Sequence, residues 1–263
     1  RRFKMAVILG GNDTLPQITL TQSQTFVPPQ DGNVCIHVVG AGGSGGARKG
    51  ASNHGGAGGY CKKNSLAVTT AGSFTVVIGV GGASHRNSNA VNAGGNSTVA
   101  GTGLSATLTA NGGGGAGPNN GAVQGAGGTA ANGDVNNTGG AGLQFAGGGA
   151  VGVYGTGATG VANITGGISD ATGGGIAMSG FGEIVGGTPQ PMGQDNGSGA
   201  YLGLGVAGDL CGGGYAQVNS NTSSLTATGG YGGIGGGGGA GDAHFAVGGR
   251  GGDGIVLIQY IPS

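Results

Sequence analysis

The sequence predicts an all-β fold: an antiparallel β-sandwich with a large glycine-rich insertion that forms a polyglycine-II-like helix bundle, and almost no α-helix. Three observations predict it. Short β-branched segments bounded by turn residues occupy the first 110 residues. Glycine supplies 74 of the 263 residues and dominates residues 111–253. Glycine and β-branched residues interrupt every candidate helix, so no helical period with caps develops.

The first 110 residues contain seven segments with the composition of strands, separated by turns rich in proline and glycine. Apolar and polar residues alternate in 34–38 and 74–78, which is typical of half-buried antiparallel strands. We assign residues 1–30 to N-terminal strands and a candidate attachment segment, and residues 31–110 to the sandwich. The predicted strands are residues 5–9, 17–20, 24–27, 34–39, 65–68, 74–78 and 105–108.

The glycine-rich tract, residues 111–253, excludes most ordinary folds, since each ordered glycine costs roughly 0.5–1 kcal/mol relative to alanine. Collagen needs glycine at every third position and abundant proline, whereas this register is broken repeatedly and the chain has 7 prolines. A disordered linker normally carries many charges, but only 7% of the residues in the whole chain are charged, and apolar side chains punctuate the glycine clusters. We favour a bundle of extended polyglycine helices with display loops over disorder, because such helices hydrogen-bond only to their neighbours.

Residues 254–263 close the chain, and the apolar run 255–261 is its strongest predicted strand. A terminal apolar strand needs a partner, so we expect it to return to the sandwich beside 34–39 or 74–78. That return makes the glycine tract one insertion that is held at both ends.

Charge and length argue against a nucleic-acid partner and a membrane span. Lys plus Arg and Asp plus Glu number 9 each, whereas nucleic-acid binders usually carry a basic stripe. No segment approaches the roughly 20 apolar residues that cross a membrane. The apolar residues 6–9 are too few for a signal peptide, so we expect no export by a cleaved signal.

One motif looks like a cofactor site. Residues 40–45 read GAGGSG, a GxGxxG that follows a predicted strand. Dinucleotide binding also needs a helix after the glycines, and none is predicted there, so we expect no cofactor. The same glycines place Ser44 in a GxSxG, but the 4 histidines are scattered and no catalytic set emerges. We therefore expect no catalytic residues and no enzyme activity.

Metal sites are not predicted either. Residues 248–256 fit the nonapeptide of calcium-binding β-rolls, but those sites need tandem copies and the chain has one, so we expect Asp253 to cap a turn into the last strand. The histidines lack metal-ligand spacing. Cys35, Cys61 and Cys211 are expected to be buried and reduced, with a Cys35–Cys61 bridge left open.

Several glycine motifs occur in a specific order. Residues 39–43 (VGAGG) are followed by 55–60 (GGAGGY) and 71–82 (AGSFTVVIGVGG), and 251–258 (GGDGIVLI) close the chain. Over residues 33–260 this order resembles the glycine-rich domain of bacteriophage tail-fibre and related adhesin proteins. The resemblance implies a virion surface component, assembled in the host cytoplasm, without catalytic residues. Fibres of this kind are commonly trimeric, so a homotrimer is the default, although a single chain could build its own bundle.

The expected function is that of a tail fibre or receptor-binding protein that contacts the host cell surface. Its expected partners are other virion proteins, through the N-terminal region, and a host cell-surface receptor. Exposed aromatic rings give large contact areas at small entropic cost, although each ring could equally pack against the bundle. The candidate receptor-contact residues are Tyr154, Phe181, Tyr201, Tyr231 and Phe245.

Two other functions fit the same sequence. One is a virion structural protein without a receptor role, such as a head fibre, an adaptor or a decoration protein. The other is a glycine-rich extracellular adhesin stabilised by calcium, or an ice-binding glycine bundle.

Overall fold

The computed structural model describes residues 17–47, 53–86, 90–117, 124–143, 231–242 and 247–262, together with 148, 151, 156–157, 159 and 217–218. The predicted strand at residues 5–9 lies outside them. Within this part of the chain the fold is all-β, with antiparallel sheets and no helix, as predicted. Accordingly, no helix there is long and apolar enough to span a membrane.

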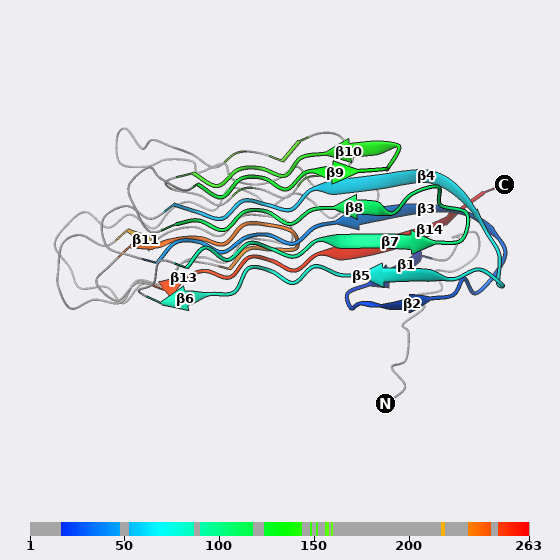
Figure 1. The fold of residues 1–263 in the computed structure, drawn as a ribbon, viewed down its shortest axis with the longest axis horizontal. Coiled ribbons are helices and arrows are strands. Elements are labelled where there is room, and N and C mark those ends of the chain that lie inside the picture. Colours follow the sequence, from blue (N-terminus) through cyan, green and yellow to red (C-terminus); the bar gives the residue numbers. More distant parts are fainter. Residues whose placement is uncertain are drawn as a thin grey trace, which may run out of the picture.

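Two five-stranded antiparallel sheets form the sandwich (Figure 1). The first contains, in spatial order, β1 (Gln17–Leu20), β14 (Ile255–Ile261), β3 (Gly32–Val39), β4 (Tyr60–Val68) and β10 (Val135–Asn137). The second contains β2 (Gln24–Phe26), β5 (Phe74–Val77), β7 (Ser97–Gly101), β8 (Leu108–Ala110) and β9 (Ala130–Ala131). Two short pairs lie outside the sandwich: β6 (His85–Arg86) with β13 (Val247–Gly248), and β11 (Gln217–Val218) with β12 (Gly241–Asp242).

The closing strand β14 lies between β1 and β3 in the first sheet. Its register with β3 runs from Ile255 opposite Val39 to Ile261 opposite Asn33. Of the two partners expected for this strand, residues 34–39 are therefore the ones that pair with it.

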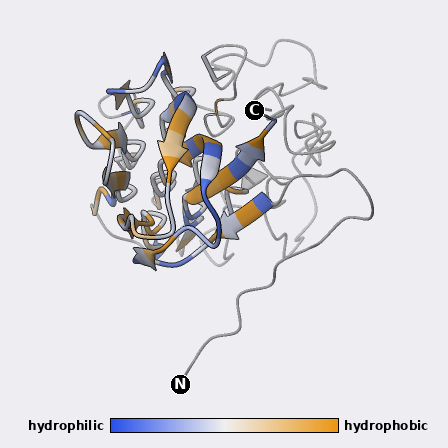
Figure 2. Ribbon diagram, turned by 90° about the vertical axis from the view of Figure 1, so that its right-hand side faces the viewer, coloured by the Kyte–Doolittle hydropathy of each residue, from blue (hydrophilic) through white to orange (hydrophobic). Residues whose placement is uncertain are grey.

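The core lies between the inner faces of the two sheets. In β5, Phe74 and Val76 are buried and alternate with exposed residues, as predicted, and the Phe74 ring lies 6.2 Å from that of Phe26. Burying a side chain of this size contributes about 1.5–3 kcal/mol. Figure 2 shows apolar residues along the sandwich strands. The core includes Ile18, Leu20, Phe26, Val34, Ile36, Val38, Leu66, Phe74, Val76, Val99, Leu108, Val256 and Ile258.

Three strand predictions need correction. Residues 34–39 are not half-buried: all six are buried, because the outer face of β3 is covered as well as the inner one. The strand predicted at 105–108 begins only at Leu108, since a bend precedes it. Strand β4 starts at Tyr60 rather than at residue 65, because its polar first half pairs with β3 and β10.

The strands continue beyond the sandwich as extended segments that run along the long axis of the molecule (Figure 1). We call these the glycine segments and, together, the glycine region. They include residues before 111, so the hydrogen-bonded glycine backbone begins directly at the end of β3. The glycine segments are residues 40–46, 53–59, 79–82, 92–95, 111–117, 125–128, 139–142, 232–239 and 249–254. Segment 232–239 differs from the others because it reverses direction at a turn over residues 234–235.

Candidate functional site

Segment 40–46 is hydrogen-bonded to six other glycine segments. Its N–H groups donate with a period of three, over 2.8–3.1 Å: Gly40, Gly43 and Gly46 to segment 53–59, Ala41 and Ser44 to 92–95, and Gly42 and Gly45 to 249–254. Its carbonyls accept from segments 79–82, 111–117 and 232–239. A β-strand has two hydrogen-bonded neighbours at most, so this packing is a different arrangement from the sandwich sheets.

Segment 53–59 has the same central position. It donates to segments 111–117 and 232–239 and to residues 140 and 143, and it accepts from segments 40–46 and 125–128 and from Gly148. Two adjacent central segments are thus enclosed by backbone from the same chain.

Close approach of the backbones explains why glycine is required here. A Cβ atom on Gly42 would lie 1.9 Å from the carbonyl oxygen of Gly236, and one on Gly58 would lie 2.0 Å from that of Gly40. Moving either carbonyl would disrupt the hydrogen bonds between the glycine segments. The GxGxxG at residues 40–45 therefore packs backbone against backbone, its residues are buried, and the residues described after it, 46–47 and 53–59, are not helical.

Every third residue of the central segments can carry a side chain. Segment 40–46 has Ala41 and Ser44 at these positions, and segment 53–59 has His54 and Ala57, all with 0% exposure. Local Gly-Gly-X triplets, such as GAGGSGGA at 40–47, are the sequence signal for this pattern. The triplets do not give the continuous repeat of collagen, because each run is short and the register changes from one run to the next.

A family model described as a glycine-rich domain matches residues 19–261, nearly the whole chain. The chain belongs to this glycine-rich domain family. A comparison with curated proteins found no match.

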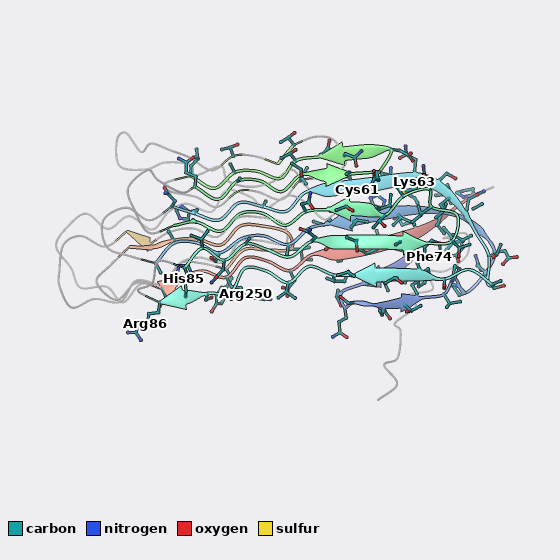
Figure 3. The ribbon with its side chains drawn as sticks, in the orientation of Figure 1. Cys61, Lys63, Phe74, His85, Arg86 and Arg250 are labelled. Carbon is teal, nitrogen blue, oxygen red and sulfur yellow. The ribbon has the colours of Figure 1, made fainter. Side chains whose placement is uncertain are left out.

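In the outer glycine segments of this glycine-rich domain, the third position carries exposed side chains. Val80 is 64% exposed on segment 79–82, and Arg250 and Asp253 are 41% and 49% exposed on segment 249–254. Tyr231, directly before segment 232–239, is 56% exposed. We call these four side chains the Tyr231 flank. Figure 3 shows Arg250 on the glycine region, away from Phe74 and Cys61 in the sandwich.

Backbone hydrogen bonds hold the parts of the Tyr231 flank side by side. Gly232 donates to the carbonyl of Arg250 over 2.9 Å, and Gly251 donates to that of Gly82 over 3.0 Å. Asp253 Oδ1 accepts from the N–H of Gly81 over 2.7 Å and also from the Arg250 guanidinium. Asp253 thus bonds to another segment, beyond the turn-capping role that the sequence suggested.

Of the five predicted receptor-contact residues, Tyr231 alone lies in the part of the chain that the structure describes. Tyr154, Phe181, Tyr201 and Phe245 lie outside the described residues. The exposure of Tyr231 is compatible with a contact role. Sequence reasoning missed Arg250 and Asp253 as its neighbours, since only the packing of segments brings these residues together.

A second cluster, buried on the outer face of the first sheet, centres on His37. Its Nδ1 lies 2.7 Å from Tyr60 Oη, and its Nε2 lies 3.2 Å from both Gln259 Oε1 and Cys35 Sγ. Because an amide oxygen only accepts, Nε2 carries the proton and the Tyr60 hydroxyl donates to Nδ1. Burial, aided by the nearby charge of Lys62, lowers the pKa of His37 to about 4.

Burial also lowers the pKa of His54 in the glycine region to about 4. Its Nδ1 donates to the carbonyl of Leu143 over 2.7 Å, while Nε2 is buried without a partner. Both histidines are therefore neutral at pH 7, and the pKa values of the Cys35 and Cys61 thiols are raised by burial, that of Cys61 to about 11. Such protonated thiols are poor nucleophiles and poor metal ligands.

The thiols of Cys35 and Cys61 are free, so the bridge left open by the sequence does not form. Cys61 faces the sandwich core, whereas Cys35 lies beside His37 on the outer face. Cys211 and His244 lie outside the described residues. Among the residues described, no group of three or more His, Cys, Asp or Glu side chains could hold a metal ion.

Proposed function

We propose that this glycine-rich domain is a phage virion protein, a tail fibre or receptor-binding protein that contacts the host cell surface. In this proposal the sandwich is the base, the glycine region is a rigid extension, and the extension presents binding residues. Other virion proteins bind near the N-terminal region, and the receptor binds on the glycine region.

The observation that carries the proposal is the separation of the two ends of the molecule. Gln17 pairs with Gln259 near the end of β14, so the first and last described strands meet at the end of the sandwich that lies away from the glycine segments (Figure 1). Successive glycine segments run away from the sandwich and back towards it (Figure 1). Attachment at the sandwich end leaves the glycine region free to contact the host cell, which is the layout that a fibre protein requires.

We further infer that the glycine region is a polyglycine-II-like bundle. The period of three in the donors of segment 40–46 and the six neighbours of each central segment support this inference. A backbone hydrogen bond contributes about 0.5–1.5 kcal/mol net. That gain offsets the roughly 0.5–1 kcal/mol cost of ordering each glycine.

A binding experiment on cells tests the proposed function. Fluorescently labelled full-length chain is incubated with a panel of bacterial strains, and phage adsorption is then measured on each strain that the chain binds. We expect saturable binding to at least one strain and reduced adsorption there. A chain that binds no strain, or that binds without reducing adsorption, contradicts the receptor role.

Electron microscopy of particles labelled with antibody against the chain distinguishes the structural alternatives. Label at fibre tips supports the proposal, whereas label on the head or along a collar favours a head fibre, decoration protein or adaptor. The homotrimer stays a prediction. The two central segments take all their neighbours from one chain, so the glycine region does not itself require further copies.

A further inference from the structure

The Tyr231 flank brings together three kinds of chemistry on a rigid backbone. Tyr231 supplies an exposed aromatic ring, Val80 an exposed aliphatic group, and Arg250 with Asp253 a paired donor and acceptor. Val80, Arg250 and Asp253 project from hydrogen-bonded glycine segments, and Tyr231 directly precedes one, so the backbone beneath the flank is ordered before any ligand arrives. A site of this kind loses little conformational entropy on binding.

The Arg250–Asp253 pair is held in place and still has hydrogen-bonding capacity. Both contacts that fix Asp253, from Gly81 N–H and from the guanidinium, use Oδ1. Oδ2 of this half-exposed carboxylate is therefore left as an acceptor, and the guanidinium keeps N–H donors beside it. An acceptor beside a set of donors is able to bind two adjacent hydroxyl groups.

The charges of the flank exclude some ligands. Arg250 and Asp253 neutralise one another, so the flank has no net charge to attract a phosphorylated or acidic polymer. The large exposed apolar side chains of the described glycine region are few: Val80, Val91 and Tyr231. A stable protein interface buries about 800 Å² on each partner with an apolar centre, which so few side chains on bare glycine backbone do not provide.

We propose that the Tyr231 flank binds a neutral glycan. The C–H face of a sugar stacks on the Tyr231 ring, and adjacent hydroxyls bind Asp253 Oδ2 and the Arg250 guanidinium. The proposal rests on the proposed function and names its receptor class as a cell-surface carbohydrate. In this proposal, the receptor contact lies along the Tyr231 flank of the glycine region.

The test uses full-length chain on a printed array of neutral oligosaccharides built from glucose, galactose, mannose and N-acetylglucosamine. Saturation-transfer NMR with the methyl glycoside of the sugar that binds then reports the contact in solution. We expect Tyr231→Ala to lower the affinity at least tenfold. We expect Asp253→Asn to lower it about fivefold, because an NH2 group, which only donates, takes the place of Oδ2, the acceptor for the sugar hydroxyl. Asparagine keeps an oxygen for the Gly81 N–H, so the backbone contact survives.

Val27→Ala is the matched control, because Val27 is 52% exposed on the sandwich, after β2. It should bind as the wild type does, and all variants should melt within about 2 °C of one another, since they change exposed side chains. Wild-type chain that binds no array sugar, or Tyr231→Ala that binds as tightly as wild type, overturns the proposal.

The experiment on cells separates this proposal from the proposed function. If labelled chain binds cells and blocks adsorption, but Tyr231→Ala does so equally well, the receptor role stands and the glycan site on this flank is wrong. If the chain binds array sugars through Tyr231 but binds no cell, the glycan site stands and the phage receptor role is wrong. Cell binding that depends on Tyr231 but survives removal of surface glycans identifies a protein receptor and also overturns the proposal.

Discussion

The sandwich and the glycine region are built from the same strands but are held together by different forces. In the sandwich, side chains such as Phe74 and Leu108 fill the space between two sheets. In the glycine region, backbones of segments such as 40–46 touch directly, and each central segment has six hydrogen-bonded neighbours. The sandwich therefore depends on the volume of its side chains, and the glycine region depends on their absence.

The substitution with the largest expected effect adds one methyl group to the centre of the glycine region, where the absence of side chains matters most. Gly42→Ala places Cβ 1.9 Å from the Gly236 carbonyl oxygen, so the two segments must separate. We expect a loss of more than about 4 kcal/mol in the free energy of unfolding, at the upper end for single substitutions. Urea denaturation followed by circular dichroism measures it.

Gly72→Ala is the control for this substitution. Gly72 lies in a sandwich turn, where the nearest atom to a new Cβ is 3.2 Å away. We expect a change of about 1 kcal/mol or less. Equal effects of the two substitutions would contradict the view that close backbone approach sets the requirement for glycine.

The next largest effect removes side-chain volume from the sandwich. Leu108 is fully buried in the core, so Leu108→Ala should cost about 2–5 kcal/mol through lost burial and the cavity that remains. Urea denaturation gives the change. Hydrogen exchange should show faster exchange in the sandwich strands, and a cost below about 1 kcal/mol would mean that the core is loosely packed.

Lowering the pH tests the stability of both regions at once, because each contains a buried histidine that is neutral at pH 7. The pKa values of His37 in the sandwich and His54 in the glycine region are lowered from 6.5 to about 4. Between these values the unfolded chain binds protons that the folded chain does not, so the contribution of the two histidines to stability falls as pH drops from 6.5 to 4 and levels off below 4. The slope is at most about 1.4 kcal/mol per pH unit for each histidine.

The variants His37→Gln and His54→Gln divide this acid response between the two regions. Each should remove part of the drop in the urea midpoint between pH 6.5 and 4. The double variant should leave only the part that comes from other groups, such as His85, whose pKa is also lowered by burial. A wild-type slope that both single variants leave unchanged would exclude these histidines as the cause.

The substitution with the smallest expected effect is at Ser44, two residues from Gly42 in the same segment. Ser44 is fully buried, and its Oγ has no hydrogen-bond partner among the residues that the structure describes. Ser44→Ala keeps Cβ and removes that hydroxyl, so stability should stay within about 0.5 kcal/mol of wild type or rise slightly. A loss above about 1 kcal/mol, measured by thermal denaturation, would show that the hydroxyl makes a contact after all.

Prediction from the sequence succeeded where side chains carry the pattern. The alternation at 74–77 and the apolar run at 255–261 indicated strands, and the structure places strands at both. The strand β7 at 97–101 was missed, because small residues and glycine give it a weak signal.

The glycine region could be predicted only in part, because glycine has no side chain to indicate a neighbour. The period of three is local and is visible in the Gly-Gly-X triplets of 40–47. Which segment bonds to which depends on residues up to about 200 positions apart, as between Gly42 and Gly252. For the same reason, the sequence predicted only one residue of the Tyr231 flank. Val80, Arg250 and Asp253 are placed on the same flank as Tyr231 only by the packing of the segments.

The six neighbours of segments 40–46 and 53–59 also constrain the order of folding. A segment enclosed on all sides cannot be the last to arrive, so these two must pair before the outer segments close around them. They are also the first glycine segments to be synthesised, and most of their neighbours follow in sequence. The chain can therefore grow its glycine region outward from the centre as it leaves the ribosome, and the final strand β14 completes the sandwich last.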